Sequence, residues 1–562
     1  MGKRYRKMRI AGVLIFIIAA FAVSFFRISF VSKFFIRLIL GESAFLIEQL
    51  MENGVWSSIN KAFCTGKRKL FFSFFVLLCL ALLGMCLITD GGYPIFRNAI
   101  ILSVLSGAEG GLIAFFQYFS WKKSIARITG LLISVFGLIF MMIIPYGVVP
   151  DEAMHLNTAY HVSDRIMRTV SSDPQKTMMR VEDAEHKLTE TEYDDEKMEA
   201  YFAVFDSRNE GLQLSEKKAP LVKGYDYLYV IPAMGISLGR ICHLNTFQTF
   251  LLGRLCNLIL SVICISLAVS FLPFGKMILL VMGLMPMNLQ QAMSYSYDAP
   301  INAMFFLFIA LVMQRFYGKK KESKIQLICM IILAVLIAMV KSHAYVMLSF
   351  LPVFLWIGTK TEKLTRKRKK VLLSVILIGI VLICAGVFLF ARNMPQVQLR
   401  PKGSYSILFL LQNPGEILNI VYRTFSDSSA WYLDTMVGMY LGYLNLKISP
   451  VIIYMIYLLL LIATVKDKDE EQYVSWNDRI VFLITAFFIT AFTFGGMLLA
   501  NSEYKDHLVR GMQGRYLLPA VMLTVFCFRN THIQKDHAMD HYVLCGELIA
   551  LLLVICNLIA IV

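Results

Sequence analysis

The sequence is poor in charged residues and lacks the cysteine spacing of a metal or redox protein. Charged residues make up 17% of the 562 residues and hydrophobic residues 57%, whereas about a quarter of the residues in soluble domains are charged. The 11 cysteines are scattered, and no CxxC pair occurs among them. This spacing excludes the usual zinc and redox motifs and favours cysteines that act as small apolar packing residues.

A basic domain with interleaved aromatic residues is also missing, although the net charge is +17. Such a domain is what nucleic-acid binding requires, so we expect no nucleic-acid partner. Lys and Arg gather instead in short linkers between apolar stretches, as at Lys319-Lys320-Lys321. This is the pattern of cytoplasmic loops in membrane proteins, and it makes the lipid bilayer the expected partner.

More than ten apolar stretches are long enough to cross a bilayer as helices. We therefore expect an all-α, polytopic transmembrane bundle of about 13 to 15 spans in the cell membrane, with the basic N-terminus in the cytoplasm. Residues 32–65 and 224–298 leave the number of crossings open, and 225–241 has the length of a partial or re-entrant segment. Helices relevant to the site are expected at 125–148, 248–272, 277–291, 299–317, 344–358 and 516–529.

Three parts follow from this pattern: an N-terminal membrane extension at 1–121, a transmembrane core at 122–530, and a C-terminal transmembrane helix at 531–562. The core carries one acidic loop without long apolar runs, at 150–223. The preceding helix begins at cytoplasmic lysines, so the loop is expected on the extracytoplasmic side. Within it, Val181 to Tyr201 has the composition of a solvated helix. Long loops on a rigid scaffold are often functional.

The first candidate for chemistry is Pro150-Asp151-Glu152, with His155 and Tyr160 following. Pro150 favours an extended residue before it, so the preceding helix should end at Val149. A carboxylate at this membrane surface could take a proton from a sugar hydroxyl as a general base. The alternative is a helix cap, because acidic residues also favour a helix N-terminus.

Two further candidates lie at expected outer ends of helices. Asp298 stands between apolar segments, where an acidic residue is costly and often functional, although a cap before Pro300 explains it too. Lys341, in Lys341-Ser342-His343, runs against the positive-inside bias. The lysine could bind a phosphate, with His343 nearby, or extend to the lipid headgroups.

The fourth candidate is the segment from Arg510 to Pro519, which contains Gln513, Arg515 and Tyr516. Two arginines with glycines between them suit a phosphate, because the guanidinium offers several donors and glycine allows close backbone approach. Four segments thus place carboxylates and cations on one side of the membrane. An enzyme with a lipid-phosphate donor needs this set, a base and cations for the leaving phosphate.

Three of these motifs resemble a bacterial membrane family known as domain of unknown function 2142, which is grouped with the GT-C glycosyltransferases. They are Pro-Asp-Glu-x-x-His at 150–155, Tyr-Asp-Ala at 297–299 and Gln-Gly-Arg-Tyr-x-x-Pro at 513–519, and the resemblance covers about 125–530. It implies a GT-C-like fold and a polyprenyl-phosphate sugar donor. It also implies an acidic base at Asp151 with Glu152 beside it, a second acid at Asp298 and a phosphate-binding Arg515. The usual GT-C acids have other spacings, so the choice between Asp151 and Glu152 stays open.

The expected function is therefore a membrane glycosyltransferase that moves a sugar from a polyprenyl-phosphate carrier to a cell-surface polysaccharide or lipid-linked glycan. Its partners would be the polyprenyl-phosphate-linked sugar and the glycan acceptor. A transporter or flippase for a lipid-linked glycan, and a polysaccharide polymerase or ligase, are the alternatives. The sequence identifies no definite cofactor, and a divalent metal stays open because the paired acids have no His-rich cluster around them.

Overall fold

The computed structural model describes residues 125–561 except for 186–212, 363–388, 390–402 and a few gaps of one to three residues. The expected N-terminal extension at 1–121 and an apolar stretch at 371–391 lie outside the described residues.

Helices long and apolar enough to span a membrane dominate the described part of the chain. They are α6 (Ile125–Ile143), α11 (Thr246–Phe271), α14 (Asp298–Tyr317), α22 (Trp476–Asn501) and the segment Met539–Leu558 of α24 (His537–Ile561). Shorter apolar helices lie among them: α15 (Lys324–Met339), α21 (Pro450–Ala463) and the run of η6 (Gly514–Leu517) into α23 (Leu518–Cys527). The prediction of an all-α polytopic membrane protein is confirmed.

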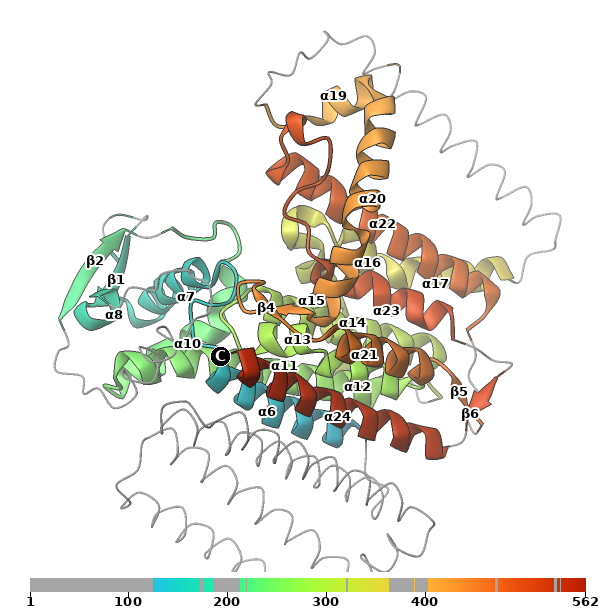
Figure 1. Ribbon diagram of the computed structural model, residues 1–562, viewed down its shortest axis with the longest axis horizontal. Coiled ribbons are helices and arrows are strands. Elements are labelled where there is room, and N and C mark those ends of the chain that lie inside the picture. Colours follow the sequence, from blue (N-terminus) through green and yellow to red (C-terminus); the bar gives the residue numbers. More distant parts are fainter. Residues whose placement is uncertain are drawn as a thin grey trace, which may run out of the picture.

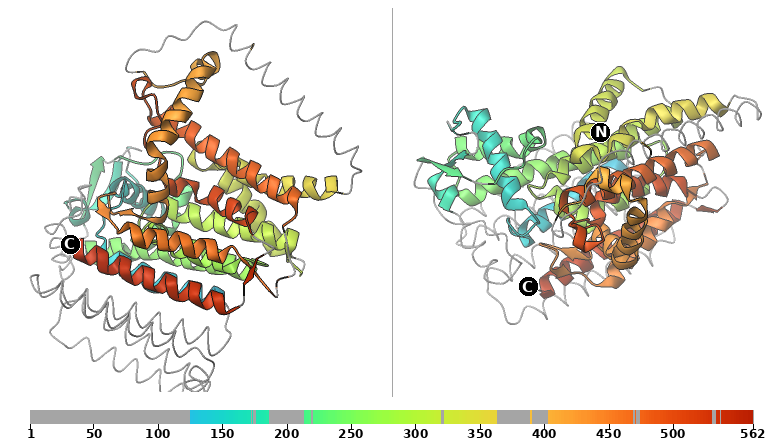
Figure 2. Two further views of the ribbon diagram at one scale, coloured as in Figure 1. Left: turned by 45° about the vertical axis from the view of Figure 1, so that its right-hand side comes forward. Right: turned by 90° about the horizontal axis from the view of Figure 1, so that it is seen from above.

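The centre of the bundle is built on α11, which packs against both α6 and α14. Close approach depends on glycine: a Cβ at Gly137 of α6 would come within 2.4 Å of the Leu258 side chain on α11. Small residues permit this contact in membrane bundles, where lipid gives helices no hydrophobic reason to associate. Figures 1 and 2 show α6, α11, α12 and α24 lying side by side in this layer.

Proline breaks three of the expected helices. The stretch 277–291 forms α12 (Lys276–Leu284) and α13 (Pro286–Ala292) instead of one helix, because Pro286 has no N–H for the preceding turn and starts the second helix. The stretch 344–358 is likewise divided into α16 (Val346–Ser349) and α17 (Leu351–Glu362). The helix expected to end at Val149 ends at Ile143, since Pro145 already limits it.

The acidic loop forms a lobe at one end of the bundle, at the left of Figure 1. It comprises α7 (Glu152–Met167), β1 (Lys176–Arg180), α8 (Val181–Glu185) and β2 (Leu214–Lys218), followed by η3 (Asp226–Tyr229) and α10 (Val230–Ile241). β1 and β2 pair antiparallel, with Lys176 opposite Lys218. The 12 residues of α10 span about 18 Å, less than the roughly 30 Å of a bilayer core.

Buried ion pairs hold this lobe together. Arg180 and Asp183 pair at 2.7 Å, and Arg240 pairs with Asp164 at 2.8 Å. The prediction of a solvated helix from Val181 is therefore wrong at Asp183, whose side chain is fully enclosed by donors. The rest of that predicted helix lies outside the described residues.

The opposite end of the bundle carries a parallel pair of short strands, β5 (Lys466–Asp467) and β6 (Gln534–Lys535). A third feature is an arm that rises from the bundle in Figure 1 and in the left view of Figure 2. Its elements are α19 (Ile407–Gln412), α20 (Pro414–Val437), the end of α22 and η5 (Tyr504–Asp506). The hairpin β3 (Tyr440–Leu441) and β4 (Leu446–Lys447) follows α20.

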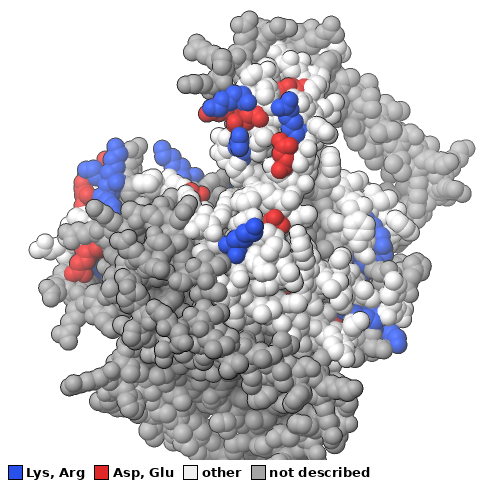
Figure 3. Space-filling view, viewed as in Figure 1, with Lys and Arg blue, Asp and Glu red and all other residues white. Residues whose placement is uncertain are grey.

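Charged side chains follow this division on the face drawn in Figure 3. They gather on the arm and on the lobe, with smaller groups on the body between them and at the right of the picture, and the described surface among these groups is uncharged.

Candidate functional site

One carboxylate shared by two cations lies at the junction of three distant segments. The Asp298 oxygens are 2.6 Å from Lys341 Nζ and 3.0 Å from Arg515 Nε. The three side chains are 7%, 10% and 4% exposed, respectively. We refer to these residues as the Asp298 cluster. The cluster has a net charge of +1 in a largely dehydrated place, and it unites three of the four candidate segments.

Asp298 is positioned by the start of α14. Its backbone N–H donates to Ser296 Oγ at 3.2 Å, and it is the first residue of the helix. The positive end of the helix dipole therefore faces the carboxylate, as a cap would have it. The cap and the functional interpretation are compatible, because both oxygens of Asp298 are directed at cations from other elements.

Lys341 reaches the cluster from a left-handed turn. Lys341, Ser342 and His343 have φ values of 48°, 52° and 69°, a conformation that costs about 1–3 kcal/mol per residue outside glycine. The Ser342 N–H donates to the Tyr225 hydroxyl at 2.9 Å, which holds the turn. The turn directs Lys341 inward and leaves His343 exposed, with Nδ1 at 2.7 Å from Ala338 O.

The Lys341 ammonium remains a cation at neutral pH. Burial lowers its pKa to about 8, with Asp298 opposing that change and Arg515 adding to it. The ammonium also lies 3.5 Å from the centre of the Tyr516 ring and 5.2 Å from that of Tyr297. Such contacts with aromatic faces stabilise the charged form.

Arg515 is fixed by the glycine before it. A Cβ on Gly514 would lie 1.7 Å from Tyr432 O, so only glycine lets this turn meet α20. The Gly514 N–H donates to Thr435 Oγ1 at 2.8 Å. The Arg515 Nη1 atom is buried and has no hydrogen-bond partner among the described residues. A buried cationic donor without an acceptor is what a site for an anion presents.

The rest of the fourth candidate segment lies around Arg515 in different environments. Gln513 has a buried Oε1 atom that lacks a partner among the described residues. Arg510 is exposed and pairs with Asp506 at 3.4 Å, so it lies outside the cluster.

Aromatic side chains line the cluster. Tyr225 stacks on Tyr297 with 6.0 Å between ring centres, and His155 meets Tyr297 edge-on at 4.9 Å. The Tyr345 hydroxyl donates to Tyr516 O at 2.9 Å. Aromatic faces with polar groups at their edges suit the apolar faces and hydroxyls of a sugar ring.

His155 is neutral in this place. Burial is the main cause that lowers its pKa to about 3, and the charge of Asp298 opposes it. Nδ1 lies 2.6 Å from the Tyr229 hydroxyl. We assign the hydroxyl as donor, because an imidazole nitrogen is the stronger acceptor, which leaves the ring proton on Nε2. His155 can therefore donate a hydrogen bond without adding charge.

Asp151 does not act as the helix cap that the sequence allowed. Its side chain accepts no capping hydrogen bond, its φ is 60°, and it is exposed. Burial is the main cause that raises the pKa of the Tyr229 and Tyr516 hydroxyls, and the charge of Asp151 adds to it. A strained, exposed carboxylate without a capping bond is available for chemistry.

Glu152 has a different environment. Its carboxylate accepts two bonds from Arg254, at 2.9 and 2.6 Å, one from the Gly147 N–H and one from the Tyr295 N–H. Both Glu152 and Arg254 are buried. Four donors leave the carboxylate no free lone pair directed at the site, so Glu152 anchors α7 to α11.

Tyr160 is also turned away from the cluster. Its hydroxyl donates to Asp183 at 2.8 Å, and the Arg240 guanidinium lies 4.6 Å from its ring centre. Tyr160 therefore belongs to the packing of the lobe.

Several residues of the site were missed from the sequence. Tyr225, Tyr229 and Tyr345 bring hydroxyls to the cluster, and Arg254 holds Glu152. The run Tyr225-Asp226-Tyr227-Leu228-Tyr229 before an apolar helix was a signal that could have been used. Among the described residues, no group of three or more His, Cys, Asp or Glu side chains could hold a metal ion.

A family model described as "Predicted membrane protein (DUF2142)" matches residues 131–524, a range that includes the Asp298 cluster and Asp151. No curated protein and no solved structure matches the chain.

Proposed function

Because the chain belongs to the DUF2142 family of predicted membrane proteins, we propose that it is a glycosyltransferase that uses a polyprenyl-phosphate sugar. It would transfer the sugar to a polysaccharide or lipid-linked glycan on the extracytoplasmic face. The observation that carries this proposal is the buried Arg515 Nη1 without a partner, in a cluster of two cations and one carboxylate.

A bound anion would compensate both the net charge of that cluster and its unpartnered donor. A buried net charge and a buried unsatisfied donor each cost free energy, and one phosphate removes both costs. Arg515 offers a planar fork of donors and Lys341 a point charge, the pair of cations that phosphate sites commonly combine. Asp298 begins a helix that is long and apolar enough to span a membrane, and the end of such a helix would be a depth suited to a phosphate on a lipid chain.

The chemistry would be direct displacement at the anomeric carbon. Asp151 takes the proton of the acceptor hydroxyl, whose oxygen forms the new bond to that carbon. The bond to the phosphate oxygen breaks, and the phosphate leaves with its charge held by Arg515 and Lys341. A single displacement inverts the anomeric centre. His155, through Nε2–H, would position a sugar hydroxyl.

The two alternative functions would require different features of the structure. Transport of a lipid-linked glycan is favoured by Glu547, which is buried in α24 with neither oxygen partnered among the described residues, and by the break between α12 and α13. A transporter would need such groups along one path. Arg254, a buried charge within another candidate span, is held by Glu152. A polymerase or ligase would share the proposed site and differ in its donor.

The test is lipid-linked glycan profiling of cells that lack this protein, complemented with wild type or with Asp151→Asn. The transferase proposal expects the polyprenyl-phosphate sugar to accumulate in both the deletion and the Asp151→Asn strain. A general base contributes roughly 10²–10⁴ in rate, so a variant without it should restore almost no glycan.

The matched control is Glu216→Gln, which removes an exposed carboxylate that pairs with Lys176 on the lobe. It should complement fully, because exposed ion pairs contribute little. Full complementation by Asp151→Asn would refute the base assignment. Accumulation of a finished glycan on the cytoplasmic side in the deletion strain would favour transport instead.

A further inference from the structure

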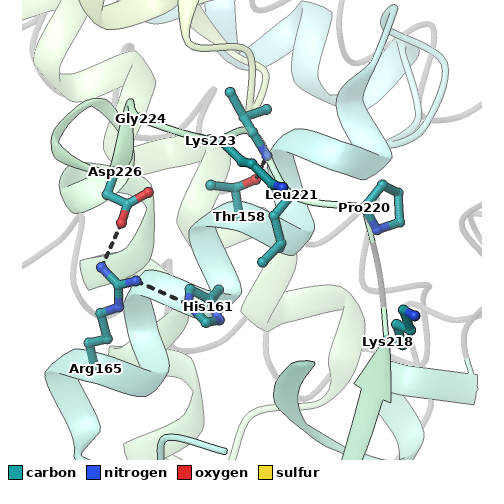
Figure 4. A pocket seen from close by; sticks show the side chains of 10 residues that line it. Thr158, His161, Arg165, Lys218, Pro220, Leu221, Lys223, Gly224 and Asp226 are labelled. Carbon is teal, nitrogen blue, oxygen red and sulfur yellow. Dashed lines mark hydrogen bonds and ion pairs between the residues drawn. The ribbon is translucent and has the colours of Figure 1, made fainter. Parts of the chain in front are cut away.

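A cavity lies in the lobe, outside the Asp298 cluster. It has a volume of about 630 Å³, within the roughly 300–1,000 Å³ of ligand pockets. Figure 4 shows its walls, which are one side of α7 and the chain that follows β2. The lining residues are Thr158, His161, Arg165, Lys218, Pro220, Leu221, Val222, Lys223, Gly224 and Asp226.

His161 lines this cavity and carries a ring donor that has no partner among the described residues. It is 5% exposed, and its Nε2 accepts from Arg165 Nη2 at 3.2 Å. A guanidinium can only donate, so the proton of the neutral ring is on Nδ1. That Nδ1 atom is buried and has no partner among the described residues. A ligand acceptor in the cavity would satisfy it.

The charged side chains of the cavity are mostly cationic. Arg165, Lys218 and Lys223 line it together with one carboxylate, Asp226, which is 2.5 Å from Arg165. Both lysines are exposed, and neither forms an ion pair with another described residue. The surplus of positive charge favours an anionic ligand.

The wall opposite α7 is tied in place. Thr158 Oγ1 accepts from the Val222 N–H at 2.9 Å and donates to Met154 O at 2.8 Å. The cavity is therefore a formed feature of the lobe, held by backbone contacts, and it does not depend on the lysine side chains.

The cavity lies next to the proposed reaction site. Positions 155, 158, 161 and 165 follow at three- and four-residue steps, so they share one side of α7. His155 meets the aromatic residues of the Asp298 cluster, and the other three line the cavity. The wall opposite α7 also connects the cavity to the reaction site. Asp226 lines the cavity, and Tyr229 in the same short helix is hydrogen-bonded to His155.

We propose that this cavity binds an anionic group, carboxylate or phosphate, on the glycan that accepts the sugar. The role as acceptor site rests on the proposed function, whereas binding of an anionic glycan does not. An acceptor held there by its charge would extend along α7 toward Asp151, which begins that helix. The acceptor would thus be a charged polymer, such as a uronate-containing or polyol-phosphate chain.

The experiment is a binding titration of the full-length protein in detergent micelles with three probes of matched length. The probes are a galacturonate tetrasaccharide, a glycerol phosphate tetramer and neutral maltotetraose. We expect one or both anionic probes to bind more tightly than maltotetraose, and the stronger of them identifies the charged group. In Lys218→Gln/Lys223→Gln, that affinity should fall about tenfold or more, since hydrogen bonds to charged groups contribute strongly.

Arg168→Gln is the matched control, because it removes an exposed cation at the end of α7 that does not line the cavity. Its affinity should equal that of wild type. Equal binding of neutral and anionic probes, or unchanged affinity in the double variant, would overturn the proposal. A protein that binds the anionic probe and transfers no sugar would contradict the proposed function alone.

Discussion

Replacement of Arg515 by lysine separates the anion-binding role of this residue from its structural role. Lysine keeps a positive charge that can reach Asp298, which Arg515 Nε contacts at 3.0 Å. It lacks the second and third nitrogens of the guanidinium, including the Nη1 atom that has no partner among the described residues. The substitution therefore removes the proposed phosphate donor and retains the ion pair.

The expected loss follows from one hydrogen bond to a charged acceptor. Such bonds contribute about 1.5–3 kcal/mol, which corresponds to a roughly 10- to 150-fold weaker affinity. Lys341 still supplies a cation, so binding should weaken and not vanish. The fold should tolerate the change, because no hydrogen bond within the described part of the chain uses Nη1.

The assay is binding of farnesyl phosphate to the purified protein, with the melting temperature measured on the same samples. Arg510→Lys is the control, since Arg510 is exposed outside the cluster and pairs only weakly with Asp506 at 3.4 Å. A melting temperature near wild type together with an affinity within twofold of wild type would refute the assignment of Nη1 as a phosphate donor.

Three further predictions concern the same site. Asp298→Asn should cost about 3–5 kcal/mol of unfolding free energy by leaving buried cations unpaired, and adding Lys341→Met should recover part of it in a denaturation assay; no recovery would contradict the pairing. Burial lowers the Lys341 pKa to about 8, so the ammonium is charged below that pH. The affinity for farnesyl phosphate should therefore fall as the pH rises from 7 to 9. A flat profile over that range would exclude the lysine from binding. Gly514→Ala should abolish binding of farnesyl phosphate, because its Cβ would lie 1.7 Å from Tyr432 O. Gly495→Ala, whose Cβ would have nothing within 4 Å, should instead raise stability by about 0.5–1 kcal/mol in thermal unfolding.

The fold class and the proximity of the candidate motifs could be predicted, because hydrophobicity and charge are local properties of the sequence. Apolar runs place Asp298, Lys341 and Arg515 at helix ends on one side. Helix ends on the same side of a membrane lie in one layer, so residues more than 200 positions apart become neighbours. The structure brings these three into direct contact.

The roles of individual acids could not be predicted in the same way. Asp151 and Glu152 are adjacent in sequence, yet one is exposed and the other receives four hydrogen bonds. The difference depends on Arg254, 102 residues away from Glu152. Nothing in the local pattern identifies which carboxylate an arginine of another helix will meet. Helix breaks at Pro145 and Pro286 were local signals that could have been weighed more heavily.

The Asp298 cluster would be an unfavourable arrangement if its only role were to stabilise the fold. A buried ion pair is often no more stabilising than an apolar contact of the same shape, and a second cation adds a charge that nothing balances. Lys341 reaches Asp298 only through three consecutive left-handed residues, which cost several kcal/mol in sum. Apolar residues on an unstrained turn would pack here at a lower cost in free energy. Strain, surplus charge and an unpartnered Nη1 in one place are costs that a bound anion would offset, and conflicts between local preference and fold are expected where a protein binds its ligand.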